Sequence, residues 1–104
     1  MMLLQVEPFK MGSDKDAALK PLEEAAEVFA AFQEIDGCGS PSQCNEQCEV
    51  LEVCEARVHF SDEIADCIQA CVNIAARYKI DMSEAVRRCE ERNRERGRYD
   101  GDDE

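Results

Sequence analysis

The segment from Asp62 to Tyr78 constrains the fold more than any other part of the sequence. Taken as a helix at about 100° per residue, it spreads its apolar side chains over an unusually wide arc: Ile64, Cys67, Ile68, Cys71, Val72, Ile74 and Ala75. Its polar residues keep to one narrow strip: Glu63, Asp66, Asn73 and Arg77. A helix with this pattern packs on several sides. The chain therefore needs other helices, or other chains, to cover it.

Three more helices are expected around this one. The first spans about residues 20–35, with Pro21 in its first turn, and ends at the breaker sequence DGCGSP. The other two span about residues 42–57 and 82–96. A short turn in SDKDAALK, residues 13–20, adds a fifth element. The pattern predicts an all-α bundle of four to five helices.

Capping residues and breakers set the expected boundaries. Ser13 or Asp14 suits the N-cap of the short turn, and Asp81 or Ser83 suits that of the last helix. The sequence VHFSD, residues 58–62, is expected to end one helix and to begin the next, with Ser61 as the N-cap of the second.

The chain divides into three expected parts. Residues 1–13 form an extended N-terminal segment, residues 14–98 a helical domain with a Cys-rich insert at about 37–58, and residues 99–104 an acidic, disordered tail. At 104 residues, this is one domain.

The net charge and the cysteine content limit the kinds of partner and the cellular compartment that we expect for this chain. A net charge of −12 repels phosphate, so we expect neither a nucleic acid polymer nor an anionic membrane as partner. No apolar run approaches the roughly 18 residues that span a bilayer. The start MMLLQVEPF lacks the features of a signal peptide. Seven cysteines are an odd number, and with no export signal they indicate free thiols in a cytoplasmic protein.

Acidic residues recur at helical spacing on two of the expected helices. In residues 20–35 the apolar side chains make one broad face, expected to face the core: Leu22, Ala25, Ala26, Val28, Phe29, Phe32 and Ile35. The opposite face carries Glu23, Glu24, Glu27 and Glu34. These glutamates form either a solvated face or one half of a cation site, because like charges three and four apart repel one another.

A second acidic pair supports the cation site. Glu63 and Asp66 stand three apart on their helix, as Glu24 and Glu27 do on theirs. If the two helices pack antiparallel, the four carboxylates converge. Ligation by oxygen alone suits a hard cation, Mg²⁺ or, as the alternative, Mn²⁺.

These motifs resemble those of the MazG-like, all-α nucleoside triphosphate pyrophosphatases. The family pattern E-E-x-x-E followed by E-x-x-D appears as EEAAE, residues 23–27, and EIAD, residues 63–66. The segment VNIA, residues 72–75, is similar to the family's V-N-L-A, and RRCEERNRERG carries a basic residue followed by N-x-x-R. The resemblance covers about residues 17–36 and 60–98. The link between the acidic motifs is longer than in the family because of the Cys-rich insert.

The resemblance implies an activity and a set of roles. A nucleoside triphosphate, with ribose or deoxyribose, would be cleaved to the monophosphate and pyrophosphate by metal-assisted attack of water on the α phosphorus, which suits removal of unwanted nucleotides. Mg²⁺ would be held by Glu24, Glu27, Glu63 and Asp66, with Glu23 ordering the water or a second ion. Asn73 would contact the sugar or a phosphate, and Arg92 and Arg96 the β and γ phosphates. The family also implies a homodimer or a dimer of dimers.

Two features allow other interpretations. Six of the twelve basic residues lie between Arg87 and Arg98, where interleaved glutamates are equally typical of a solvated, salt-bridged helix.

The cysteines at 38, 44, 48 and 54 lack the spacing of a zinc finger, so we expect no structural zinc. Cys67, Cys71 and Cys89 are expected in the core, and lone His59 on the surface. The alternative function is a non-catalytic, acidic helical adaptor or inhibitor with a Cys-bound zinc.

Overall fold

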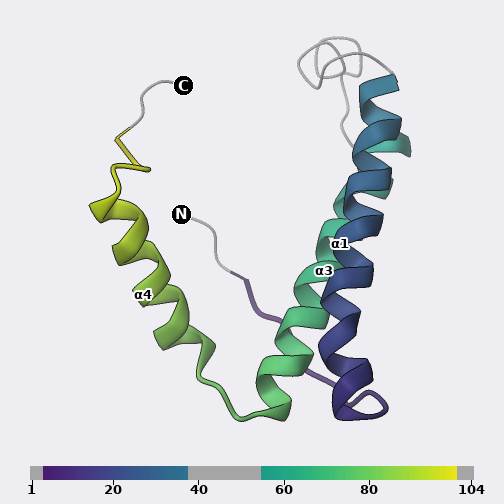
Figure 1. The fold of residues 1–104 in the computed structure, drawn as a ribbon. Helices are drawn as coiled ribbons and strands as arrows, with labels where there is room; N and C mark the ends of the chain where they lie inside the picture. Colours follow the sequence, from purple (N-terminus) through teal and green to yellow (C-terminus); the bar gives the residue numbers. More distant parts are fainter. Residues whose placement is uncertain (1–3, 38–54, 101–104) are drawn as a thin grey trace.

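A computed structural model describes residues 4–37 and 55–100 of the chain (Figure 1). Three helices are found there: α1 (Asp14–Gly37), α3 (Glu55–Arg77) and α4 (Met82–Glu95). The described residues contain no strand, so the all-α prediction is confirmed. Most of the helix expected over residues 42–57, like the Cys-rich insert around it, lies outside the described residues.

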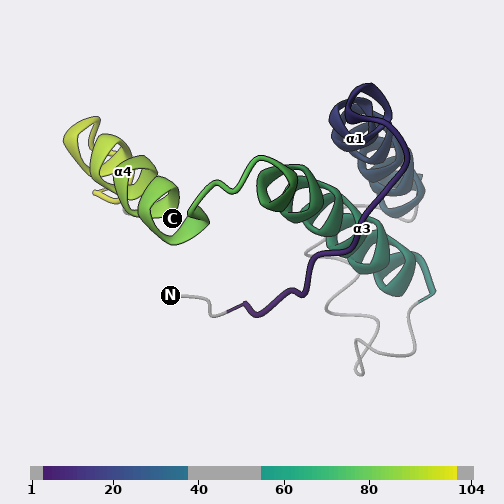
Figure 2. The same ribbon diagram turned by 90° about the horizontal axis from the view of Figure 1, so that it is seen from below.

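Helices α1 and α3 pack side by side and antiparallel (Figures 1 and 2). Most residues buried between them are small: Ala17, Ala31 and Ile35 on α1, and Ala70 and Ala75 on α3. Alanines on both surfaces let the two backbones approach closely, as ridges of one helix enter grooves of the other. The core that the described residues form is thus one narrow seam between two helices.

Helix α1 is longer than the sequence pattern predicts. Ser13 caps it, since the Asp16 amide donates to Ser13 Oγ at 3.1 Å, and the expected short turn and helix merge into one element. Pro21 therefore lies inside the helix and not in its first turn, which is a correction. The reason is that Ala17 and Ala31, on either side of the proline, belong to the same buried face. Packing against α3 outweighs the hydrogen bond that the proline removes.

Helix α3 also runs through an expected break. VHFSD lies within the helix, and Ser61 is not an N-cap: its hydroxyl donates to the Val58 carbonyl at 2.8 Å. No glycine or proline occurs between Glu55 and Arg77, so nothing in the segment forces the helix to end. The prediction of an interruption there was wrong.

The two faces of α1 are distributed differently from the prediction. Glu24 lies on the face that packs on α3 and is only 7% exposed. Leu22 and Phe29, expected in the core, are 69% and 60% exposed. The buried side chains of α1 recur at helical spacing and are those of Ala17, Glu24, Ala31 and Ile35, whereas Leu22 and Phe29 lie on a second face that the described residues leave exposed.

The N-terminal segment, residues 4–12, crosses the outside of α3 in an extended form (Figure 2). The Phe9 amide donates to Asn73 Oδ1 at 2.9 Å, and Gln69 Nε2 donates to the Glu7 carbonyl at 2.9 Å. Arg77 donates to the carbonyls of Met11 and Gly12 and pairs with Asp14. One polar strip of α3 thus holds the segment in place.

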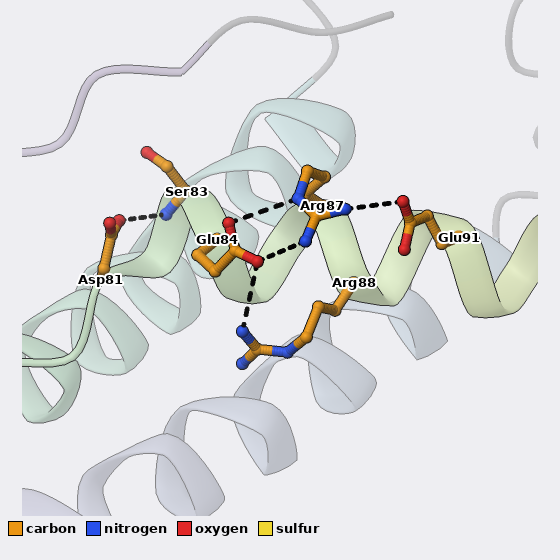
Figure 3. A network of polar contacts seen from close by, with 6 residues as sticks. All are labelled: Asp81, Ser83, Glu84, Arg87, Arg88 and Glu91. Atoms are coloured by element: carbon orange, nitrogen blue, oxygen red, sulfur yellow. Dashed lines mark hydrogen bonds and ion pairs between the residues drawn. The ribbon is translucent and has the colours of Figure 1, made fainter.

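Helix α4 stands apart from the α1–α3 pair (Figures 1 and 2). The sequence predicts Asp81 or Ser83 as its N-cap, and the structure shows Asp81 there. The Asp81 side chain accepts a hydrogen bond from the Ser83 amide at 3.0 Å. Figure 3 shows that Arg87 bridges Glu84 and Glu91 along one side, with Arg88 also on Glu84. The first half of the basic segment is therefore a salt-bridged surface. None of the described helices is long and apolar enough to cross a membrane.

Candidate metal site

Three of the predicted carboxylates meet between α1 and α3. Glu24 comes from α1, and Glu63 and Asp66 come from adjacent turns of α3. One carboxylate oxygen from each lies within 4.8 Å of the others. The i, i+3 spacing on α3 turns two acidic side chains toward the same neighbour, and the antiparallel packing brings Glu24 opposite them. The convergence expected from the sequence is found for these three residues.

The cluster leaves buried carboxylate oxygens without a partner. Oε1 of Glu24 and Oε1 of Glu63 are both buried, and neither accepts a hydrogen bond from any described residue. Such atoms carry a desolvation cost unless something compensates them. Two of them in one cluster point to a cation that completes the site.

The second oxygen of each of these glutamates is paired with a basic residue one turn earlier. Lys20 Nζ lies 3.2 Å from Glu24 Oε2, and also 3.4 Å from Glu23. His59 Nε2 lies 3.0 Å from Glu63 Oε2. In both cases the base holds one oxygen, and the other is the buried oxygen that has no partner among the described residues. Partners behind the ligands commonly orient them in this way at metal sites.

These ion pairs shift the pKa values of the two basic side chains, Lys20 and His59. Hydrogen bonds to Glu24 and then Glu23 raise the pKa of Lys20 above its usual value. The pKa of His59 is also raised, chiefly by the hydrogen bond between its Nδ1 and Glu34 at 3.1 Å, against a smaller opposing effect of burial. His59 therefore joins Glu34 of α1 to Glu63 of α3.

A small cavity of about 120 Å³ opens beside the cluster. Glu24 and Asp66 line it, together with Lys20 and Asn73. The N-terminal segment closes one side through Phe9 and Met11. Glu24 and Asp66 are therefore reachable by a small ligand, and Asp66 is the most exposed of the three cluster residues.

The other predicted site residues lie elsewhere. Glu27 is exposed on α1 and does not belong to the three-carboxylate cluster, and Glu23 is exposed next to Lys20. Asn73 is buried, and its Oδ1 accepts both from Phe9 N and from Gln69 Nε2. Asn73 thus holds the N-terminal segment as well as lining the cavity.

Arg92 and Arg96 are exposed near the C-terminal end of α4, and the structure does not bring them to the carboxylates. Arg96 is the C-cap of that helix and its amide donates to the Arg92 carbonyl at 3.1 Å.

The sequence interpretation missed Lys20 and His59. Both stand four residues before a cluster glutamate, at the spacing at which a basic and an acidic side chain meet on a helix. That repeated spacing, Lys20 to Glu24 and His59 to Glu63, was the available signal. His59 is on the surface as expected, but it lies within α3 and contacts the site.

The described thiols are free, and none of them belongs to the three-carboxylate cluster. Cys67 is half-buried, and burial followed by the neighbouring Cys71 raises the pKa of its thiol. Cys71 and Cys89 are exposed in this chain, so the expectation that they lie in the core was wrong. The four cysteines on which a zinc site would depend lie outside the described residues.

The donors in the cluster fit a hard divalent cation. All three are carboxylate oxygens, which Mg²⁺ and Mn²⁺ prefer. A Mg–O distance of about 2.1 Å places oxygens on opposite sides of the ion about 4.2 Å apart, which fits within the 4.8 Å limit of the cluster. Comparisons of the chain with protein-family models, with curated proteins and with solved structures found no match. The MazG-like resemblance therefore depends on the motifs quoted above.

Proposed function

We propose that the chain is a Mg²⁺-dependent hydrolase that cleaves nucleoside triphosphates to the monophosphate and pyrophosphate. The observation that carries the proposal is the meeting of Glu24, Glu63 and Asp66 between two helices, with two buried oxygens unpartnered. Both motifs on which the MazG-like resemblance depends contribute to this cluster. A purely solvated acidic face would not bury Glu24.

The three carboxylates would hold the ion from one side. Bound there, Mg²⁺ would offset the negative charge of the triphosphate, which the acidic chain otherwise repels. Glu24 and Glu63 are fixed from behind by Lys20 and His59, so they enter the reaction already oriented. Asp66 is the most accessible of the three and lies toward the small cavity.

The reaction requires one water molecule and no redox partner. The water oxygen forms a bond to the α phosphorus, and the bond from that phosphorus to the α–β bridging oxygen breaks. Pyrophosphate leaves with the bridging oxygen, and the proton of the water passes to a carboxylate or to solvent. Ordering of the water by Glu23, ligation by Glu27, and the contacts of Asn73, Arg92 and Arg96 remain parts of the proposal that rest on the resemblance.

The activity is tested by a panel of ribo- and deoxyribonucleoside triphosphates with Mg²⁺, scored for pyrophosphate against orthophosphate. In the same assay, Asp66→Asn is expected to lower turnover at least about 100-fold, since it removes a ligand whose ion stabilises the transition state by several kcal/mol. Its melting temperature should not fall, because Asp66 is exposed and the change removes repulsion.

The matched control is Asp62→Asn, which makes the same chemical change at an exposed position of α3 outside the cluster. It should leave turnover and stability near the wild-type values. Added Mg²⁺ should raise the melting temperature of the wild type and of Asp62→Asn more than that of Asp66→Asn. Absence of hydrolysis of every triphosphate in the panel, or equal turnover by Asp66→Asn and wild type, would refute the proposed function.

A further inference from the structure

A second, larger cavity of about 910 Å³ lies next to the carboxylate site. The N-terminal segment forms one wall through residues 8–12, and the C-terminal end of α3 forms the other. Phe9, Met11 and Asn73 line both this cavity and the smaller one that contains Glu24 and Asp66. The two cavities therefore adjoin at these three residues.

The charge of this cavity is opposite to that of the chain. Its lining includes Lys10, Arg77 and Lys79 and no carboxylate, in a protein whose net charge is −12. Arg77 is already engaged with Asp14 and two carbonyls of the N-terminal segment. Lys10 and Lys79 make no ion pair with any residue of the described ranges 4–37 and 55–100. Two cations in one cavity without a counter-charge favour an anionic ligand.

Lys79 stands at a position where a lysine is unfavourable for the fold. Its φ is 57°, in the left-handed region, where it ends α3 while the Ile80 amide donates back to the Ala75 carbonyl at 2.9 Å. Glycine is the usual residue at this position after a helix, because a Cβ is strained there. The side chain thus adds strain where it also adds positive charge to the cavity.

We infer that the larger cavity binds the terminal phosphates of the substrate, with Lys10 and Lys79 as the residues that hold them. This inference rests on the proposed function, in that the α phosphate would lie at the carboxylates and the β and γ phosphates would extend past Phe9 into the cavity. Lys10 and Lys79 would take the role that the resemblance gives to Arg92 and Arg96, because both lysines line the cavity beside the cluster, whereas the two arginines lie at the end of α4, which stands apart. The released pyrophosphate would occupy the same cavity.

The test is calorimetric binding of inorganic pyrophosphate to the full chain in EDTA, which removes any contribution of a metal. Lys10→Gln and Lys79→Gln are each expected to weaken binding about tenfold, the loss expected for one hydrogen-bonded charge. Lys15→Gln is the matched control: it removes the same charge from an exposed lysine on α1 that does not line the cavity. It should leave the affinity within about twofold of wild type.

Lys79→Gly separates binding from folding. Glycine relieves the left-handed strain, so the melting temperature should stay the same or rise while pyrophosphate affinity falls as in Lys79→Gln. Lys79→Arg keeps the charge and should retain the affinity of the wild type. If Lys10→Gln and Lys79→Gln bind pyrophosphate like the wild type, or if Lys15→Gln loses as much affinity as they do, the inference is wrong.

Two further outcomes separate this inference from the proposed function. If adenosine or uridine, which carry no phosphate, binds while pyrophosphate does not, the cavity takes the nucleoside and the inference fails. If pyrophosphate binding depends on the two lysines but no triphosphate is hydrolysed, the polyphosphate site is supported and the proposed reaction is refuted.

Discussion

At the scale of single residues, His59 has the widest connections around the carboxylates. Its two ring nitrogens contact carboxylates of different helices, Glu34 on α1 and Glu63 on α3. The contact with Glu63 leaves the other oxygen of that side chain buried and unpartnered among the described residues. One side chain therefore both ties the helix pair together and orients a proposed metal ligand.

This arrangement predicts a pH-dependent contribution to stability. The pKa of His59 is raised in the folded chain, so the protonated form stabilises the fold fully below the unfolded pKa of about 6.5. The contribution is lost as the pH rises through the folded pKa. We expect the wild type to melt above His59→Gln by a margin that is largest near pH 5.5 and shrinks toward about pH 8.5. Thermal melts in EDTA across that interval measure it.

The control is Glu34→Gln, which removes the main cause of the shift. Its stability relative to wild type should change with pH in the same direction as that of His59→Gln. A margin between wild type and His59→Gln that is constant with pH, or that grows as the pH rises, would contradict the assignment.

At the scale of helices, α1 shows how far the sequence predicts the structure. Helical spacing correctly predicts helices around the two acidic motifs, and the i, i+3 pair Glu63 and Asp66 correctly predicts that these side chains approach Glu24. Period alone does not say which of two faces is buried. Of the predicted core face, Ile35 is buried but Leu22 and Phe29 are exposed, because the stripe that packs on α3 is rotated toward Ala17, Glu24 and Ala31.

The boundaries missed by the sequence analysis have a related cause. Pro21 is locally unfavourable for a helix and the VHFSD segment is at best neutral, yet both lie inside long helices. Their local cost is offset by contacts with a neighbouring helix, which residues distant in the sequence supply. Lys79 is a third case, because nothing in the sequence marks a lysine that adopts a left-handed conformation.

The proline yields a prediction for α1 as a whole. Pro21 stands seven residues after the start of the helix and removes a hydrogen bond to the Ala17 carbonyl. Pro21→Ala restores that bond and improves helix propensity, with a partial offset because alanine gives the unfolded chain more freedom. We expect a gain of about 1–3 kcal/mol in the free energy of unfolding, measured by chemical denaturation.

Lys15→Ala tests whether helix propensity alone explains such a gain, since it changes an exposed residue in the first turn of the same helix. Its effect should be within about 0.5 kcal/mol of zero. A Pro21→Ala chain that is less stable than the wild type would contradict the prediction and would mean that α1 needs the proline for its bend or its packing.

At the scale of the molecule, the part of the chain that the structure describes leaves much apolar surface uncovered. Leu19, Leu22 and Phe29 lie along one face of α1 and are 42%, 69% and 60% exposed. Val86 of α4 is 47% exposed, and no described residue of α4 is buried. Within the described ranges, one helix pair and a detached third helix bury little apolar surface. Exposed apolar faces of this extent are typical of interfaces.

We therefore expect the protein in solution to have a mass at least twice the 11.7 kDa of one chain. A second copy is the simplest partner, because the same α1 face can serve on both sides of a two-fold axis.

Leu22→Glu combined with Phe29→Glu places charges in this face and should shift the mass measured by light scattering toward that of the monomer. Both side chains are exposed within one chain, so the fold of the helix pair itself should tolerate the change. Glu90→Gln combined with Glu91→Gln, two exposed changes on α4, controls for the number of substitutions and should leave the mass unaltered. A wild-type chain that remains a monomer at micromolar concentration would contradict the expected assembly. If Leu22→Glu combined with Phe29→Glu leaves the mass of the wild type unchanged, this face of α1 is not the interface.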